Sequence, residues 1–372
     1  MKRLLLLGGG HGHLAVLKSF GDARPAGADL ALVSPYRHAL YSGMVPGLIA
    51  GHYALSDCSI DLEPLARRAG ARFVRDAAVG LDSARREVLT AKGERLPYDV
   101  LSLDVGSSVE KPGRASERAL GVRPIEAFLE AWARLREQVA RREIRRIAVV
   151  GGGAAGVELL LAMQHRLAAT EAQFALFSDL PILPGHDEDV RRRLARILEE
   201  RGAAIHVGRK VVAVGKSELR LEGGERFEAQ ATVWATGARA PSWIAGSGLA
   251  TDAQGFVAVG ETLQSTSHPE VFAAGDVAGA AGVRRPKSGV YAVRQGPALA
   301  RNLRLVLAGH APEPFRSPAR ALALISCGGR YAVASWGRFA FEGAWVWRWK
   351  DRIDRRFVRR YGKEATTRKE EP

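Results

Sequence analysis

The chain has 372 residues, of which 47% are hydrophobic and 26% charged, and these fractions exclude disordered and fibrous proteins. Its length allows two or three domains, each with its own core. The net charge of +15 would suit a nucleic acid or an anionic membrane, but much of it is arginine spread along the chain, so we expect solvated arginine faces and no nucleic-acid partner.

Neither a targeting segment nor a membrane-spanning segment is predicted. The apolar run Leu4–Leu7 resembles the start of a signal peptide, but it ends at Gly8 and is too short for one. Nowhere do about 18 apolar residues follow one another, as a transmembrane helix requires. The two cysteines, Cys58 and Cys327, exclude a disulfide framework and favour a reducing compartment. We therefore expect a cytoplasmic protein, with the inner face of the membrane as the alternative location.

A strand, a glycine turn and a helix follow one another twice along the chain. The first copy has an apolar strand at residues 3–7, glycines between 8 and 12, and a helix at 14–20. The second copy has the corresponding elements at 147–150, 151–156 and 157–167. Further strands are expected in each copy at 29–34 and 98–107, and at 173–178 and 231–237. The repetition predicts two nucleotide-binding domains of similar plan.

The remaining segments complete an α/β fold with two Rossmann-like three-layer dinucleotide-binding domains, the second inserted in the first. An amphipathic helix at 124–142, with Phe128, Trp132, Leu135 and Val139 on one face, connects the two copies. A strand at 271–276 and a helix at 290–307 return to the first domain. The expected boundaries are 1–120 and 266–311 for the first domain, 121–265 for the second, and 312–372 for a C-terminal segment with strands and a basic helix.

The second glycine turn matches G-x-G-x-x-G at Gly151, Gly153 and Gly156. The first glycine permits a tight turn, the second lets the backbone approach a pyrophosphate, and the third lets helix and strand pack closely. The helix N-terminus then offers N–H groups to the phosphates. Because the context of strand and helix is correct and duplicated, a dinucleotide site is predicted here.

The first turn matches the motif incompletely. Gly8 and Gly10 take the first two places, but His13 stands in the third. A second register, through Gly10, Gly12 and Ala15, fits the G-x-G-x-x-A form, although the end of the strand favours the first. We expect looser packing around His13. His11, Gly12 and His13 are candidates for cofactor contact, with a role in the turn or in packing as the alternative.

The end of the second strand in each copy lacks the acid that normally binds the ribose hydroxyls. Ser34 and Ser178 stand there, with Asp179 beside the latter. No arginine within residues 178–182 could bind a 2′-phosphate, so NAD is weakly favoured over NADP and the choice stays open.

Two further motifs complete the pattern: Ala235-Thr236-Gly237 and Ala274-Gly275-Asp276. With them the chain resembles, over nearly its whole length, flavoproteins of the pyridine nucleotide-disulfide oxidoreductase superfamily. It looks closest to type II NADH dehydrogenases and sulfide:quinone oxidoreductases, within a subgroup also found fused to selenophosphate synthetase. The resemblance implies FAD in the first domain, NADH or NADPH in the second, and a hydrogen bond from the FAD ribityl chain to Asp276.

The resemblance also suggests residues near the reacting atoms. The segment 38–46, which includes Tyr41, would lie beside the isoalloxazine, and it has no cysteine pair for dithiol chemistry. Glu158 matches a glutamate near the nicotinamide, with a helix-dipole role as the alternative. Residues 286–289 resemble a P-K-T-G stretch, which makes Lys287 a catalytic candidate. The remaining cofactor-binding candidates are Arg37, Gly106, Gly237 and Gly275.

The expected activity is transfer of a hydride from NAD(P)H to flavin and on to an acceptor, with quinone leading. The A-Q-x-A-x-Q quinone motif is absent from residues 289–294, which weakens that assignment. A sulfide or persulfide oxidoreductase is an alternative, but it needs a redox pair that Cys58 and Cys327 hardly offer. A non-enzymatic flavin or nucleotide sensor is the third hypothesis.

The C-terminal helix has an apolar stripe that recurs every four residues and a strongly basic opposite face. Residues 345–363 hold eight Lys or Arg and two Asp. Such a helix can lie in the interface of an anionic membrane, or it can dock on the protein itself. Peripheral membrane contact is therefore expected as one of two alternatives for the stripe formed by Trp345, Trp349, Ile353, Phe357 and Tyr361.

Overall fold

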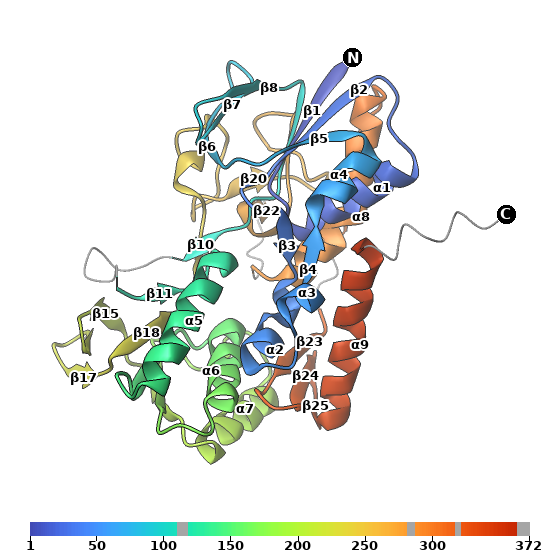
Figure 1. Ribbon diagram of the computed structural model, residues 1–372. Coiled ribbons are helices and arrows are strands. Elements are labelled where there is room, and N and C mark those ends of the chain that lie inside the picture. Colours follow the sequence, from blue (N-terminus) through green and yellow to red (C-terminus); the bar gives the residue numbers. More distant parts are fainter. Residues whose placement is uncertain (110–117, 281–286, 317–320, 363–372) are drawn as a thin grey trace.

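A computed structural model describes residues 1–109, 118–280, 287–316 and 321–362. It contains two five-stranded parallel sheets of the same plan (Figure 1). The first sheet has the order β21-β9-β1-β2-β5, formed by Val271–Ala273, Val100–Leu103, Lys2–Leu7, Ala28–Val33 and Ala71–Val74. The second has the order β11-β18-β12-β13-β14, formed by Leu120–Gly121, Ala231–Trp234, Arg146–Val150, Gln173–Ser178 and Ala204–Val207.

Each sheet lies between helices and a small antiparallel meander, which gives the three expected layers. Apolar runs such as residues 4–7 are buried on both faces, as in other covered parallel sheets. The first sheet is covered by α1 (His11–Asp22), α4 (Leu62–Ala69) and α8 (Gly289–Leu307), and by β6 (Ala78–Asp82), β7 (Glu87–Thr90) and β8 (Arg95–Pro97). The second is covered by α5 (Ile125–Ala140), α6 (Ala154–Arg166) and α7 (Glu188–Glu200), and by β15 (Val211–Val214), β16 (Glu218–Leu221) and β17 (Arg226–Glu228).

The connecting helix α5 has the predicted orientation. Its buried residues are Phe128, Trp132, Leu135 and Val139, the four assigned to one face from the sequence. Their spacing of three or four residues places them on one stripe, which packs on the second sheet and α6. The amphipathic pattern therefore determined both the element and its buried side.

The packing suggests a different end for the second domain. Ile244, in η3 (Ser242–Ile244), and Val257, in β20 (Val257–Val259), lie in the same core as Leu5 and Leu101 of the first sheet. β20 also pairs with β22 (Ala278–Ala280). We therefore propose that the second domain ends near β19 (Ala238–Arg239) rather than at residue 265, because the chain that follows buries its apolar side chains against the first domain.

The C-terminal segment contacts both domains. It comprises an antiparallel sheet of β23 (Ala323–Ser326), β24 (Ala332–Trp336) and β25 (Phe339–Gly343), followed by α9 (Ala344–Tyr361). Ile325 and Val333 pack in the core of the second domain, whereas Tyr361 packs in that of the first. In Figure 1, α9 (red) lies beside α3 (Leu55–Cys58) and β4 (Ser59–Asp61). The neighbouring short elements are β3 (His38–Leu40), η1 (Ser42–Met44) and α2 (Val45–Ala50).

Two short elements join the domains near the carboxyl ends of the sheets. β10 (Ser108–Val109) follows the first sheet and pairs antiparallel with β19 of the second domain. The helix η4 (Gly275–Val277) follows β21. Ligands of open α/β sheets bind beyond the carboxyl ends of the strands, so this junction positions the site.

Candidate functional site

The first glycines of the two turns have the same geometry. The Gly8 N–H donates to Val33 O and the Gly151 N–H donates to Phe177 O, both at 2.8 Å. Their φ angles are +92° and +125°. A Cβ would lie 2.3 Å from Asp104 O at Gly8 and 2.4 Å from Ala235 O at Gly151, so only glycine fits. This equivalence confirms the register of the first turn that begins at Gly8.

The second glycines are the N-cap residues of helices. Gly10 precedes α1 and Gly153 precedes α6. A Cβ added at Gly153, Gly106 or Gly237 would meet no atom within 4 Å. At Gly153 this open space lies beside the N-terminus of α6, which is the arrangement that a pyrophosphate requires. The second turn therefore fits a dinucleotide.

The third place of the motif is filled differently in the two turns, and the expectation of looser packing at His13 is wrong. In the second turn a Cβ at Gly156 would lie in contact with Gly151 O. In the first turn the fully buried His13 ring places Nδ1 2.6 Å from Gly8 O and Nε2 2.8 Å from Ser102 Oγ. Burial lowers the pKa of the imidazole to about 4, so the ring is neutral. We assign His13 a structural role in the turn.

Asp104 was not among the sequence candidates, although it follows a buried strand directly. Its carboxylate lies under the first glycine turn, where Oδ2 accepts the His13 N–H at 2.9 Å. A Cβ at Gly10 or Gly275 would lie 2.3 or 2.6 Å from this carboxylate. Burial raises the pKa of Asp104 to about 7, with a smaller raising contribution from the Asp276 carboxylate and against the lowering effect of the His13 and Gly12 N–H groups. Asp104 therefore joins three loops of the first domain; the signal for it was an acid at a strand end next to small residues.

Asp276 lies in η4, where loops from both sheets meet. Its Oδ2 accepts a hydrogen bond from Ser107 Oγ at 3.2 Å and forms an ion pair with Nη1 of Arg123 at 3.0 Å. Ser107 follows β9 of the first sheet, whereas Arg123 follows β11 of the second. The carboxylate predicted to bind the ribityl chain is thus at the junction of the domains.

His11 opens α1 inside a cluster of aromatic rings. Its ring centroid lies 5.4 Å from that of Tyr41 and 5.6 Å from that of Phe357, and the latter two rings stack at 4.3 Å. Burial lowers the pKa of His11 to about 4. In the part of the chain that the structure describes, its buried Nε2 has no hydrogen-bond partner. An orphaned buried nitrogen beside a phosphate-type turn fits contact with a bound cofactor.

Glu158 connects the second domain to the C-terminal segment. Its Oε1 accepts the Ser326 N–H at 2.8 Å. Burial raises the pKa of Glu158 to about 7, against the lowering effect of the Lys350 ammonium. The first turn of α6 carries no acid, because Glu158 lies beyond it, so a helix-dipole role is not supported.

A buried ion pair on α9 lies near Glu158 and near residues 38–46, the segment expected beside the isoalloxazine. Lys350 Nζ and Asp354 Oδ2 are 2.6 Å apart, and Lys350 also donates to Gly43 O. Burial and the Asp354 carboxylate both raise the pKa of Tyr41. The tertiary structure thus brings α9, Glu158 and residues 38–46 together, which the sequence did not indicate.

Three further candidates, Lys287, Ser34 and Arg37, have partners within the protein. Lys287 Nζ donates to Ala278 O at 2.6 Å and lies 3.6 Å from the Phe256 ring centroid, while Pro286 of the same motif is outside the described residues. Ser34 is buried and donates to Tyr36 O at 3.0 Å. Arg37 is paired with Asp61 at 2.9 Å.

Ser178 packs against the second glycine turn. A Cβ added at Gly152 would lie 2.5 Å from its Oγ. Ser34 and Ser178 therefore occupy equivalent places at the ends of β2 and β13, where a ribose is expected.

The cysteines are not paired. Cys58 and Cys327 are both free and buried, and they belong to separate hydrophobic clusters. Burial raises the pKa of each thiol to about 12, which disfavours a reactive thiolate. Within residues 1–109, 118–280, 287–316 and 321–362, no group of three or more His, Cys, Asp or Glu could hold a metal ion.

Comparisons with known proteins agree with this geometry. Residues 2–296 match the family model described as pyridine nucleotide-disulphide oxidoreductase. The chain is 27% identical to oxidoreductase ptaL of Pestalotiopsis fici over 92% of this chain and 94% of that protein. It is 24% identical to the type II NADH:quinone oxidoreductase Ndh of Mycobacterium tuberculosis, over 93% of this chain and 82% of that one. The sulfide:quinone oxidoreductase structure from Aquifex aeolicus superposes with a TM-score of 0.82 at 20% identity, covering 97% of this chain and 91% of that one.

Proposed function

Because this chain belongs to the pyridine nucleotide-disulphide oxidoreductase family and is an FAD-dependent oxidoreductase that uses NAD(P)H, we propose that its electron acceptor is a quinone. The relative from Mycobacterium tuberculosis, matched over most of both chains, is named for that acceptor. The observation that carries the proposal is the aromatic cluster of His11, Tyr41 and Phe357 beside the FAD turn, to which α9 contributes one ring. A flat apolar ring could stack there.

The geometry of the two glycine turns supports a set of proposed cofactor contacts. We propose that Gly8, Gly10, Gly12 and His11 hold the FAD pyrophosphate end, and that Gly106, Gly275 and Asp276 lie along the ribityl chain. The other expected FAD contacts are Ser34, Arg37 and Tyr41. For NAD(P)H the proposed contacts are Gly151, Gly153, Gly156, Ser178 and Gly237. When bound, the cofactors supply hydride transfer, and the protein supplies alignment and exclusion of water.

Glu158 and Lys287 are proposed to act near the reacting rings. Quinone reduction consumes two protons, and a carboxyl group whose pKa is raised to about 7 can release and regain a proton near neutral pH. Lys287 places its ammonium near Asp276, and burial lowers its pKa. We propose that Glu158 exchanges protons and that Lys287 contributes positive charge on the flavin side.

The test is anaerobic turnover with NADH, NADPH and a soluble quinone analogue. We expect the flavin to be bleached by a reduced nicotinamide and reoxidised by the quinone, with rates that fall as the pH rises above about 7 because Glu158 loses its proton. Glu158→Gln should remove this pH dependence. Bleaching by sulfide but not by NADH or NADPH, or bleaching without reoxidation by quinone, would refute the proposal.

We propose that the protein contacts an anionic membrane and that the quinone reaches the site from that membrane. Six side chains on β24, β25 and α9, which we call the aromatic surface, are 39–59% exposed: Trp336, Phe339, Phe341, Trp345, Trp349 and Ile353. The exposed Arg338, Arg348 and Arg352 lie among them in the chain. Apolar rings beside arginines suit the interface of an anionic bilayer. No helix in the described residues is long and apolar enough to span one.

A further inference from the structure

The carboxylate of Asp276 is held by a residue from the other domain. We propose that Arg123, supplied by the NAD(P)H-binding domain, is a positioning residue of the FAD site: it orients the Asp276 carboxylate toward the ribityl hydroxyls and places a positive charge beside the flavin. This inference rests on FAD being the cofactor, and it is independent of the acceptor.

The backbone at Arg123 is anchored in the second sheet. β11 pairs with β18 through Leu120 and Val233, and the Val122 N–H donates to Trp234 O at 3.1 Å. Pro124, the next residue, is the N-cap of α5. Because Arg123 lies between a paired strand and a helix, the position of its backbone is well defined. The contact of its side chain with the first domain therefore follows from the fold.

The protein contacts of Asp276 use one of its two oxygens. Arg123 Nη1 lies 3.0 Å from Oδ2, and Ser107 Oγ donates to the same oxygen at 3.2 Å. Arg123 also donates to Ser107 Oγ. Among the residues that the structure describes, none donates to Oδ1. A carboxylate fixed through one oxygen presents the other as an acceptor, which is what a ribityl hydroxyl needs.

The charge of Arg123 bears on the flavin itself. The ribityl chain leaves the flavin at N10, next to N1, where the reduced flavin carries its negative charge. The Arg123 and Asp276 side chains are only 28% and 17% exposed, so solvent screens this pair less than a surface pair. A cation held here stabilises the reduced form, and its loss should lower the midpoint potential.

The first experiment measures FAD binding to the apoprotein by quenching of flavin fluorescence. Arg123→Gln should weaken binding about tenfold, the loss expected for one charge-assisted hydrogen bond, and Arg123→Lys should restore most of it. Arg146→Gln is the control, because Arg146 forms a more exposed ion pair with Glu228 at the opposite end of the same sheet. It should bind FAD as the wild type does.

The second experiment asks whether Arg123 acts through Asp276. Asp276→Asn is combined with Arg123→Gln, and the effect of the arginine change on FAD affinity should largely disappear in the asparagine background. The midpoint potential of the flavin, measured by equilibration with a dye, should be lower in Arg123→Gln and recover in Arg123→Lys. If Arg123 had a purely structural role, restoring the positive charge with lysine would not restore the midpoint potential.

Three results would overturn the inference. These are wild-type affinity and potential in Arg123→Gln, an equal effect of that change with and without Asp276, or a wild-type apoprotein that binds no FAD. The last would also overturn the cofactor assignment. A protein that binds FAD but passes no electrons to quinone would refute the proposed acceptor alone, and the Arg123 measurements would then stand.

Discussion

At the scale of single residues, the two glycine turns show how one backbone geometry is reached by two sets of side chains. In the second turn, Gly156 packs on the carbonyl of Gly151, and Ala235 lies beside it. In the first turn, the His13 ring nitrogen Nδ1 hydrogen-bonds to Gly8 O, and the Asp104 carboxylate accepts the backbone N–H of His13. A polar pair therefore replaces the close contact of two small residues, and each polar atom has a partner, as burial requires.

Gly153 offers a clean test of the second turn. Gly153→Val adds a branched side chain where no protein atom lies within 4 Å and where φ is −72°, so the fold should tolerate it. FAD content should be unchanged, while reduction by NADH slows about tenfold or more because the pyrophosphate loses its approach. Stopped-flow absorbance measures both. Gly246→Val, at an equally open exposed glycine, is the control; equal rates in the two variants would contradict the site.

Asp104 predicts a specific pH dependence of stability. Its pKa is raised to about 7 in the folded protein from the ordinary value of 3.8 for an aspartate. Between these values the folded state holds a proton that the unfolded chain has lost, so stability falls as pH rises from about 4 to about 7. Asp104→Asn should remove a few kcal/mol of this decline. Urea unfolding of the apoproteins across that range measures it, and parallel curves for the two proteins would count against the assignment.

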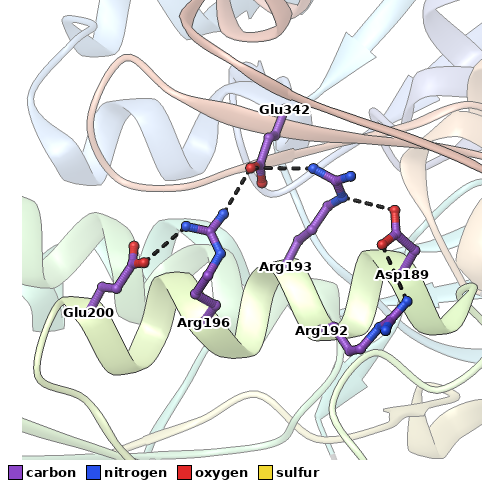
Figure 2. Close-up of polar contacts among 6 residues, drawn as sticks. All are labelled: Asp189, Arg192, Arg193, Arg196, Glu200 and Glu342. Atoms are coloured by element: carbon purple, nitrogen blue, oxygen red, sulfur yellow. Dashed lines mark hydrogen bonds and ion pairs between the residues drawn. The ribbon is translucent and has the colours of Figure 1, made fainter.

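At the scale of elements, the C-terminal sheet is attached to the second domain by a polar network on α7. Figure 2 shows Arg193 and Arg196 pointing from α7 to the Glu342 carboxylate of β25. The N–O distances are 3.3 and 2.8 Å. Asp189 and Glu200 bind the same arginines from their other sides. A half-buried network of this kind fixes geometry more than it adds stability.

Removing the central carboxylate should loosen the C-terminal sheet locally. Glu342→Gln leaves a similar shape but no charge between two guanidinium groups, so β24 and β25 should open more readily. Hydrogen exchange should become a few-fold faster in both strands and stay unchanged in β1 and β12. Glu87→Gln, which breaks the exposed pair with Arg95, is the control. Unaltered exchange in β25 would show that the network does not hold this sheet.

At the scale of the whole molecule, the apolar stripe of α9 divides into a part that docks on the protein and a part that stays exposed. The C-terminal part of the stripe docks on the protein, because Phe357 stacks on Tyr41 and Tyr361 is buried in the first core. The N-terminal part, from Trp345 to Ile353, stays exposed and continues onto the hairpin of β24 and β25. Lys350 and Asp354 are buried as well. Truncation before α9 would therefore unfold part of the site rather than test membrane contact.

Point substitutions in the aromatic surface give the sharper test. The variant Trp336→Ser, Phe339→Ser and Phe341→Ser removes three exposed rings and should leave the fold and FAD intact. The wild type should sediment with anionic liposomes at low salt and much less at high salt, since each base near the surface contributes about 1 kcal/mol. The variant should stay in solution. Equal sedimentation of both proteins, or binding to neutral liposomes alone, would contradict membrane contact through this surface.

The sequence by itself determined the local features of this protein. Apolar runs of strand length, glycines whose φ is positive, and the stripe of α5 depend on residues close together in the chain, and all appeared where expected. The same patterns, repeated, predicted two dinucleotide domains and located Gly8 and Gly151 in their turns.

Only the tertiary structure decided which distant residues complete the site. Asp104 meets His13 across 91 positions, Asp276 meets Ser107 across 169, and Glu158 meets Ser326 across 168. Arg123 lies in no motif. Its proposed role follows from the structure, because Arg123 comes directly after the β11 region and pairs with Asp276. Contacts of this range have no periodicity, because they depend on how packed elements are oriented, so no local pattern in the chain could reveal them.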